Sequence, residues 1–277
     1  MTQASKLSPQ VMGIVNVTPD SFSDGGQHDD CLAAVVHARI LLAQGAGILD
    51  IGGESTRPGA IPVPEAEELG RVLPVIRALR SETSALISID TYKPTVARAA
   101  VAVGADMWND VTALRSAGAQ EAAAELGCQV VLMHMQGDPQ TMQQAPHYRD
   151  VVAEVCEFLF QRAQATMAAG VARDRIWLDP GIGFGKTLAH NLSLLAHLDR
   201  IVALGFPVLL GASRKGLVYH LDPLAKAPID RLGGSLAAAI AGAKAGVAAV
   251  RVHDVRETVQ ALKIWSAITE ARISPDR

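Results

Sequence analysis

Three polar residues that could hold a flat ring rich in hydrogen-bond donors stand where short apolar runs end. They are Asp90, Asn109 and Asp179. A carboxylate accepts two parallel N–H bonds from a guanidine-like edge, a charge-assisted bidentate contact, and an amide both donates and accepts. These residue types at these places predict a site for a polar heterocycle.

A second set of residues is cationic or can donate hydrogen bonds to an anion, and it also follows apolar runs. Such side chains suit a phosphate or pyrophosphate group. The sequence therefore predicts a substrate in two parts, a polar flat ring deep in the fold and a phosphorylated arm at its rim. This second set comprises Asn16, Thr56, Arg57, Ser213, Arg214, Lys215, Arg251 and His253.

The glycine-rich stretch after Asp179 invites a different prediction, which its spacing excludes. Gly185-Lys186-Thr187 is similar to the end of a phosphate-binding loop. That motif needs a glycine five residues earlier, where this chain has Pro180. We therefore expect Asp179 to be the working residue here, Lys186 to be a solvated loop lysine, and His134 to be a core histidine.

Eight short runs rich in Val, Ile and Leu alternate with longer amphipathic stretches, as expected of parallel strands covered by helices. We predict strands at Val11–Val15, Ile48–Ile51, Ala85–Ile89, Asp106–Asn109, Gln129–His134, Ile176–Asp179, Pro207–Gly211 and Val247–Val252. We predict helices at Asp30–Gln44, Pro64–Arg80, Pro94–Val103, Ala119–Leu126, Tyr148–Ala169, Asn191–Ala203, Asp230–Ala245 and Val255–Ala271. Eight such units favour a (β/α)8 TIM barrel, in which the active site gathers at the carboxyl ends of the strands.

The composition fits one α/β enzyme domain and argues against several other classes. The chain has 277 residues and a formal net charge of −3. We expect a single domain over 1–277, with a short polar N-terminal extension at 1–10. Neither the charge nor the apolar tracts suggest nucleic acid or a membrane as a partner. Cys31, Cys128 and Cys156 are far apart and odd in number, which predicts reduced thiols in a cytoplasmic protein.

Several motifs, taken in chain order, resemble those of the dihydropteroate synthases. They cover the chain from about Val11 to Ala271 and are together highly specific. The matching stretches are Met12 to Gly26, Asp50 to Gly59, Ile87 to Thr91, Asn109-Asp110-Val111, Leu178 to Lys186, Ser213-Arg214-Lys215 and Arg251 to Val255.

The resemblance implies a transferase of folate biosynthesis. Members of that family condense 6-hydroxymethyl-7,8-dihydropterin pyrophosphate with p-aminobenzoate, giving 7,8-dihydropteroate and pyrophosphate. The resemblance also implies Mg²⁺ as cofactor, competition by sulfonamides at the p-aminobenzoate pocket, and a homodimer.

The resemblance further implies a role for individual residues. The implied catalytic residues are Asp90, Asp179, Lys215 and Arg251. The implied pterin contacts are Asp90, Asn109, Met133, Asp179, Phe184, Lys215 and Arg251, with the glycines after Asp179 turning Phe184 against the ring. The implied pyrophosphate contacts are Asn16, Thr56, Arg57, Arg251 and His253, and Asn16 is the implied Mg²⁺ ligand. The implied p-aminobenzoate contacts are Phe22, Pro58, Phe184, Ser213 and Lys215.

Two other functions are compatible with a barrel that binds a pterin. A pterin-dependent corrinoid methyltransferase would share the barrel and the pterin carboxylates, but it needs neither Asn16 nor Ser213-Arg214-Lys215. The chain also has no Asp-x-His-x-x-Gly corrinoid signature. A non-catalytic pterin-binding paralogue is the other alternative, and the presence of every expected functional residue argues against it.

Overall fold

The computed structural model describes residues 8–17, 27–56, 59–138 and 140–273. These residues contain one eight-stranded sheet in which all paired neighbours are parallel, in the order β6-β5-β4-β3-β2-β1-β8-β7. A bridge between Leu178 and Val208, with a 2.9 Å bond from Leu178 N to Pro207 O, brings the two end strands together. The sheet is therefore a nearly closed barrel, and the prediction of a (β/α)8 barrel is confirmed. The strands are β1 Gln10–Asn16, β2 Ile48–Gly52, β3 Leu86–Asp90, β4 Met107–Asp110, β5 Gln129–Met133, β6 Ile176–Asp179, β7 Leu209–Leu210 and β8 Ala249–Val252.

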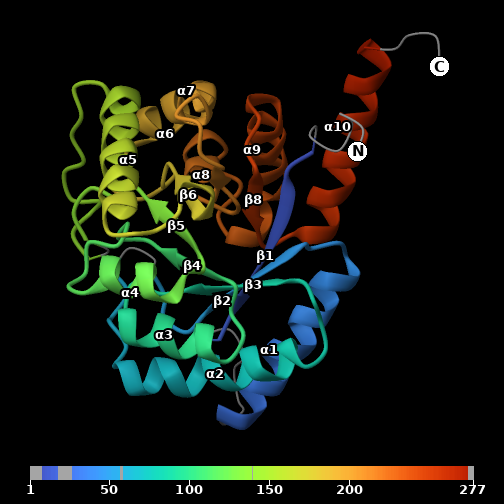
Figure 1. Cartoon of the computed structure of the whole chain (residues 1–277). Helices are drawn as coiled ribbons and strands as arrows, with labels where there is room; N and C mark the ends of the chain where they lie inside the picture. Colours follow the sequence, from blue (N-terminus) through green and yellow to red (C-terminus); the bar gives the residue numbers. More distant parts are fainter. Residues whose placement is uncertain (1–7, 18–26, 57–58, 139, 274–277) are drawn as a thin grey trace.

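Helices lie around the strands, with α1 to α4 in the lower half of the view in Figure 1 and α5 to α10 in the upper half. They are α1 Gln27–Ala43, α2 Glu65–Arg80, α3 Pro94–Ala102, α4 Ala119–Leu126, α5 Val151–Ala168, α6 Leu188–Ala196, α7 Leu198–Val202, α8 Gly216–Leu221, α9 Leu232–Ala245 and α10 Val255–Ile273. Two 3-10 turns, η3 Arg173–Arg175 and η4 Pro228–Arg231, precede β6 and α9. Among the described residues, no helix is both long and apolar enough to cross a membrane.

The helix predicted at Asn191–Ala203 differs most from the structure. It begins earlier, at Leu188, because the Thr187 hydroxyl accepts a 3.2 Å bond from His190 N and so caps the helix. It is also divided at His197, whose φ of −121° and ψ of 31° are not helical. The short helix α8 was not predicted.

The inside of the barrel holds an apolar plug at its amino-terminal end. Because side chains two residues apart on a strand point to the same face, the next inward residue of each strand lies nearer the carboxyl end. Four of those next residues are polar, so the strand period places polar side chains above the plug, and we call these four the polar layer: Asp50, Asn109, Asp179 and Arg251. The others are Ile14, Met133 and Gly211. The plug consists of Met12, Ile48, Met107, Val131, Trp177, Leu209 and Ala249.

Candidate active site

Arg251 links the polar layer across the barrel. Its Nε donates to Asp50 Oδ2 at 2.5 Å, and its Nη2 donates to Asp90 Oδ2 at 2.7 Å. Asn109 Nδ2 donates to the same oxygen of Asp50 at 3.2 Å. These bonds join the carboxyl-terminal halves of β2, β3, β4 and β8, which brings three of the residues predicted from the sequence into one cluster.

Asp50 is the residue that sequence reasoning missed. Its side chain is fully buried, and it holds both Arg251 and Asn109 in place. The signal was present, because a carboxylate stands within the apolar run Ile48-Leu49-Asp50-Ile51. Charged side chains are almost never fully buried unless they are paired, so a carboxylate inside such a strand indicates a buried partner.

The electrostatics of the cluster depend on burial. Burial raises the pKa of Asp90 to about 7, with Arg251 opposing the shift and Asp50 adding to it. Burial also raises the pKa of Asp179, against the hydrogen bond from Gly181 N. Burial lowers the pKa of Arg251, but Asp50 and Asp90 more than offset this and hold it above its ordinary value. Among the described residues, Asp90 Oδ1 is buried without a hydrogen-bond partner, so it can accept a hydrogen bond from a ligand.

Asp179 ends β6 and opens the loop predicted to carry the site. Its Oδ1 accepts a 2.6 Å bond from Gly181 N. Gly181 has a φ of +66°, and a Cβ there would stand 1.9 Å from His134 O, so only glycine fits. The tight turn is thus confirmed. The centre of the Phe184 ring lies 4.2 Å from Lys215 Nζ, so two more predicted residues are side by side.

Lys186 corrects one expectation. It is not a solvated loop lysine, since only 3% of it is exposed. Its Nζ lies 2.9 Å from Gly181 O, Phe184 O and His134 Nδ1, because the left-handed glycines fold the loop carbonyls back onto it. Burial lowers the pKa of Lys186 to about 7 and that of His134 to about 3. His134 is a buried histidine with a partner, as predicted.

The ends of β7 and β8 form a polar rim. The Ser213 hydroxyl lies 3.1 Å from His253 Nδ1 and accepts a 3.2 Å bond from His253 N. Arg214 has a left-handed φ of +56°, and its guanidinium binds both oxygens of Asp254 at 3.0 and 2.5 Å. Arg214, which the sequence grouped with the anion-binding residues, thus has its guanidinium engaged in an internal ion pair.

The neighbouring part of the mouth is formed by the ends of β1 and β2, because β1 pairs with β8. A Cβ built on Gly52 would lie 3.8 Å from both Asn16 Oδ1 and Asp90 Oδ2, so these two oxygens flank the space that the glycine leaves. Thr56 lines a cleft of about 450 Å³ together with Tyr92, Arg115 and Met135. The predicted site residues Phe22, Arg57 and Pro58 lie outside the described residues.

The comparisons with known proteins place this barrel in the class of pterin binding enzymes. The pterin binding enzyme family matches residues 12–253, which is most of the chain. The dihydropteroate synthase of Escherichia coli (strain K12) is 50% identical over 264 residues, covering 95% of this chain and 93% of the relative. The chain belongs to the dihydropteroate synthase family, a family of transferases.

Solved structures agree with this assignment in fold as well as in sequence. A Xanthomonas albilineans dihydropteroate synthase with 4-aminobenzoic acid is 54% identical, with a TM-score of 0.89, and 95% of this chain covers 93% of that one. A Yersinia pestis dihydropteroate synthase in complex with a sulfonamide drug is 47% identical, with a TM-score of 0.90, and the coverage is 98% and 97%.

Proposed function

We propose that this enzyme condenses 6-hydroxymethyl-7,8-dihydropterin pyrophosphate with p-aminobenzoate, releasing 7,8-dihydropteroate and pyrophosphate. Membership of the dihydropteroate synthase family supports this function. The single observation that carries it is the buried cluster in which Arg251 joins Asp50 and Asp90, with Asn109 on the same layer. Such a cluster offers carboxylate acceptors and a fixed cation to a flat, donor-rich ring.

In this proposal the pterin lies on the polar layer. Asp179 and Asp90 accept from its amino and ring N–H groups, and Asn109 both donates and accepts. Met133 is 4% exposed at the end of β5 and gives the ring an apolar neighbour. Phe184, Lys215 and Arg251 close around it, with Arg251 stacked on its face. The proposed pterin contacts are therefore Asp90, Asn109, Met133, Asp179, Phe184, Lys215 and Arg251.

The pyrophosphate then lies at the rim. In this proposal Arg251 of β8 and His253, which directly follows β8, face the pyrophosphate, together with Asn16 and Thr56 from the neighbouring ends of β1 and β2. We assign Arg57 to the pyrophosphate as well. Stabilising the charge of the leaving group is the largest task, because the C–O bond breaks before the new C–N bond is complete. The methylene left on the pterin is cationic, and the ionised forms of Asp90 and Asp179 stabilise it.

The residues of the rim fit Mg²⁺ bound mainly through the substrate. Asn16 Oδ1 lies beside the space above Gly52, and an amide oxygen is a ligand of the kind that Mg²⁺ prefers, whereas the nearby Asp90 Oδ2 is paired with Arg251. Among the described residues, no group of three or more His, Cys, Asp and Glu side chains could hold a metal by itself. We infer that Asn16 would be the protein ligand of the ion. When bound, the ion would neutralise charge on the leaving pyrophosphate.

The second substrate needs positioning more than activation. The amine of p-aminobenzoate is neutral at pH 7, so it attacks the cationic methylene without a strong base. We assign its pocket to the loops around the pterin edge, where Phe184 and Lys215 are in contact. Sulfonamides compete for the same pocket. The residues of this pocket are Phe22, Pro58, Phe184, Ser213 and Lys215.

An assay with both organic substrates and Mg²⁺ tests the function directly. We expect pyrophosphate release that requires the pterin pyrophosphate and p-aminobenzoate together. Asp179→Asn and Asn16→Ala should lower kcat about 100- to 1,000-fold, as loss of one charge-stabilising group does elsewhere. Asp174→Asn is the matched control, because this exposed carboxylate precedes the other end of β6.

Normal turnover in folded Asp179→Asn and Asn16→Ala variants would refute the assignment of roles. No release by the wild type, with pterin binding retained, would instead indicate a non-catalytic paralogue. Circular dichroism and thermal melting show whether each variant is folded.

We also infer a homodimer that buries the face formed by α6, α8 and η4. The exposed apolar side chains there are Leu192, Tyr219, Leu221, Leu224 and Ile229, and Leu224 is 86% exposed. Leu224→Glu should produce a monomer in analytical ultracentrifugation. Ile268→Glu on α10, at a position 52% exposed, should leave the dimer intact. A cytoplasmic location stays our proposal, supported by the free thiols of the three cysteines.

A further inference from the structure

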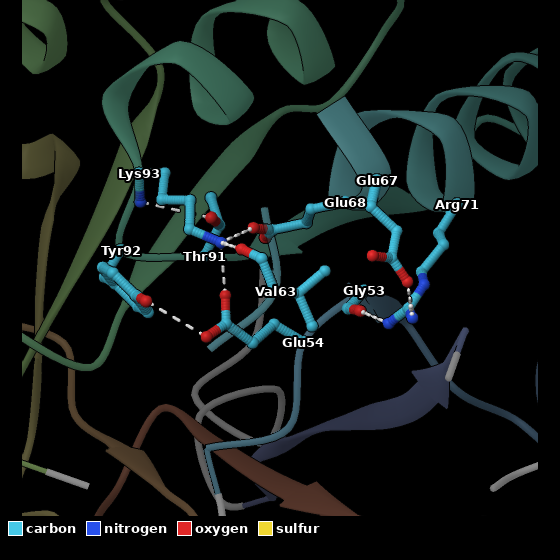
Figure 2. A network of polar contacts seen from close by, with 9 residues as sticks. All are labelled: Gly53, Glu54, Val63, Glu67, Glu68, Arg71, Thr91, Tyr92 and Lys93. Atoms are coloured by element: carbon cyan, nitrogen blue, oxygen red, sulfur yellow. Dashed lines mark hydrogen bonds and ion pairs between the residues drawn. The ribbon is translucent and has the colours of Figure 1, made fainter. Parts of the chain in front are cut away.

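The loop between β2 and α2 has a polar base, shown in Figure 2, that the proposed mechanism does not use. We define the loop base as Glu54, Val63, Glu68 and Lys93, with Tyr92 beside them. Glu54 follows β2, Val63 precedes α2, and Lys93 directly precedes α3. Thr56 and Arg57, which we assign to the pyrophosphate, lie between Glu54 and Val63.

Lys93 makes three short contacts at the loop base. Its Nζ lies 2.5 Å from Glu54 Oε2, 2.5 Å from Val63 O and 2.6 Å from Glu68 Oε2. An ammonium has three N–H donors, so these acceptors use all of them. One side chain therefore holds the first and the last residues of the loop at the same point.

The loop base is itself attached to rigid elements. Glu68 belongs to the first turn of α2, and Tyr92 OH donates a 3.0 Å bond to Glu54 Oε1. Arg71, one turn further along α2, donates a 2.6 Å bond to Gly53 O. The loop entrance is thereby fastened to α2 and to the segment after β3.

Burial makes these bonds persistent. The Lys93, Glu54 and Glu68 side chains are 11%, 7% and 0% exposed. Water competes poorly for such bonds, and removal of one partner leaves buried charge. Lys93 also balances the negative charge of the Glu54 and Glu68 carboxylates, which lie at the base of a loop that we assign to an anionic substrate.

We propose that Lys93 is a positioning residue of the reaction, which acts by fixing both ends of the Glu54–Val63 loop so that Thr56 and its neighbours meet the pyrophosphate and the amine. This proposal rests on the proposed function. It adds a residue that touches neither substrate and acts through the loop alone. Active sites work best when the residues that touch the substrate are held by a supporting set of hydrogen bonds.

Kinetics of Lys93→Gln test the proposal. We expect a rise in KM for both substrates and a fall in kcat/KM of up to about 100-fold, since small misplacements cost that much. Affinity for a pterin without pyrophosphate should stay that of the wild type, because the loop base does not belong to the polar layer. Lys93→Arg keeps the charge and the donors, and it should recover most of the loss.

Arg80→Gln is the matched control. Arg80 is also a cation that binds one carboxylate, Asp106, and main-chain carbonyls, but it stands at the other end of β3 and β4. Its replacement should lower stability without changing either KM. Should Lys93→Gln not fold, Glu54→Gln should cause the same changes in KM and kcat/KM. It weakens the contact between Glu54 and Lys93 and keeps the size of the side chain.

Amide hydrogen exchange separates this proposal from the proposed function. In Lys93→Gln, exchange of residues 54–63 should become faster by a larger factor than exchange of the strands of the barrel, which follows only the loss of global stability. Unchanged exchange there, or unchanged kinetics in a folded variant, overturns the role of Lys93. If the wild type is inactive but exchange of the loop is still faster in Lys93→Gln, the proposed reaction is refuted while the role of Lys93 in holding the loop stands. If Lys93→Gln loses affinity for the pterin without pyrophosphate as much as it loses kcat/KM, the effect of Lys93 is generally structural and the proposed role is overturned.

Discussion

Two lysines, the largely buried Lys93 and the fully buried Lys186, hold two loops at the carboxyl ends of the strands, and their surroundings have opposite electrostatic character. Lys93 at the base of the β2–α2 loop binds two carboxylates and one carbonyl. Lys186 in the β6–α6 loop binds only neutral groups, the carbonyls of Gly181 and Phe184 and the ring of His134. The two lysines perform similar geometric tasks with different acceptors.

The acceptors decide the charge. Burial lowers the pKa of Lys93, but its hydrogen bonds to Glu54 and Glu68 more than offset this and raise it above the ordinary value. Burial lowers the pKa of Lys186 to about 7, and the attraction of Asp179 only partly opposes the shift. The comparison shows that burial alone does not set the protonation of a lysine, because the charge of the groups that replace water matters as much.

The largest effect in this comparison should come from Lys93→Met. The variant leaves Glu54 and Glu68 buried without their cation, which costs about 3–5 kcal/mol. We expect that loss in the free energy of unfolding measured by urea denaturation. Arg39→Met removes an exposed ion pair with Glu82 and serves as the control, because exposed pairs contribute little. A loss for Lys93→Met no larger than that of the control would show that the loop base does not depend on charge.

Lys186→Met should have a smaller effect. It removes a donor from two carbonyls and an imidazole nitrogen, but Gly181 O keeps its bond from Phe184 N. Burial of the Lys186 charge is also unfavourable at pH 7, so we expect a net cost of about 1–3 kcal/mol. The same urea experiment measures it. The comparison fails if this variant is less stable than Lys93→Met at pH 7.

The sequence predicted the places of the strands well because a buried parallel strand is a local pattern. Asp90, Asn109 and Asp179 were found by standing at the ends of apolar runs, and the structure places each there. Strand β7 is shorter than predicted, since only Leu209 and Leu210 pair with β8. Local patterns thus give the site its position along the chain.

Which side chains contact each other in the site could not be predicted in the same way. Arg251 and Asp50 are 201 positions apart, and only the closed barrel brings them within 2.5 Å. The prediction that Lys186 is solvated was wrong for a related reason. Its acceptors are mostly main-chain carbonyls, and the direction of these carbonyls depends on glycines with left-handed backbone angles. The sequence gives the type of each side chain, but the loop geometry that buries Lys186 is set by backbone angles.

The pH dependence of stability should sharpen the comparison between the two lysines. Lys186 has a folded pKa of about 7, below an unfolded value of about 10.4. Between these values the unfolded chain binds more protons, so stability rises with pH by up to about 1.4 kcal/mol per unit. Wild type should therefore gain stability over Lys186→Met between pH 7 and pH 9, in urea denaturation at each pH.

The deficit of Lys93→Met should stay constant over the same range. The folded pKa of Lys93 is raised, so its contribution is fully present below the unfolded value of about 10.4 and is lost only as pH rises further. If the stability differences from wild type depended on pH in the same way for Lys186→Met and Lys93→Met, the conclusion that the two lysines have surroundings of opposite electrostatic character would be wrong.

The smallest effect should come from Tyr92→Phe, which removes one hydroxyl from the loop base. The lost bond to Glu54 Oε1 should cost about 0.5–1.5 kcal/mol, because Lys93 still holds the other oxygen of this carboxylate. Tyr148→Phe is the matched control, since its hydroxyl donates a 2.7 Å bond to Gly185 O on the β6–α6 loop. If Lys93 is the residue that fixes the β2–α2 loop, Tyr92→Phe should leave exchange of residues 54–63 near that of the wild type. Exchange as fast as in Lys93→Gln would move that role from the ammonium to the phenol.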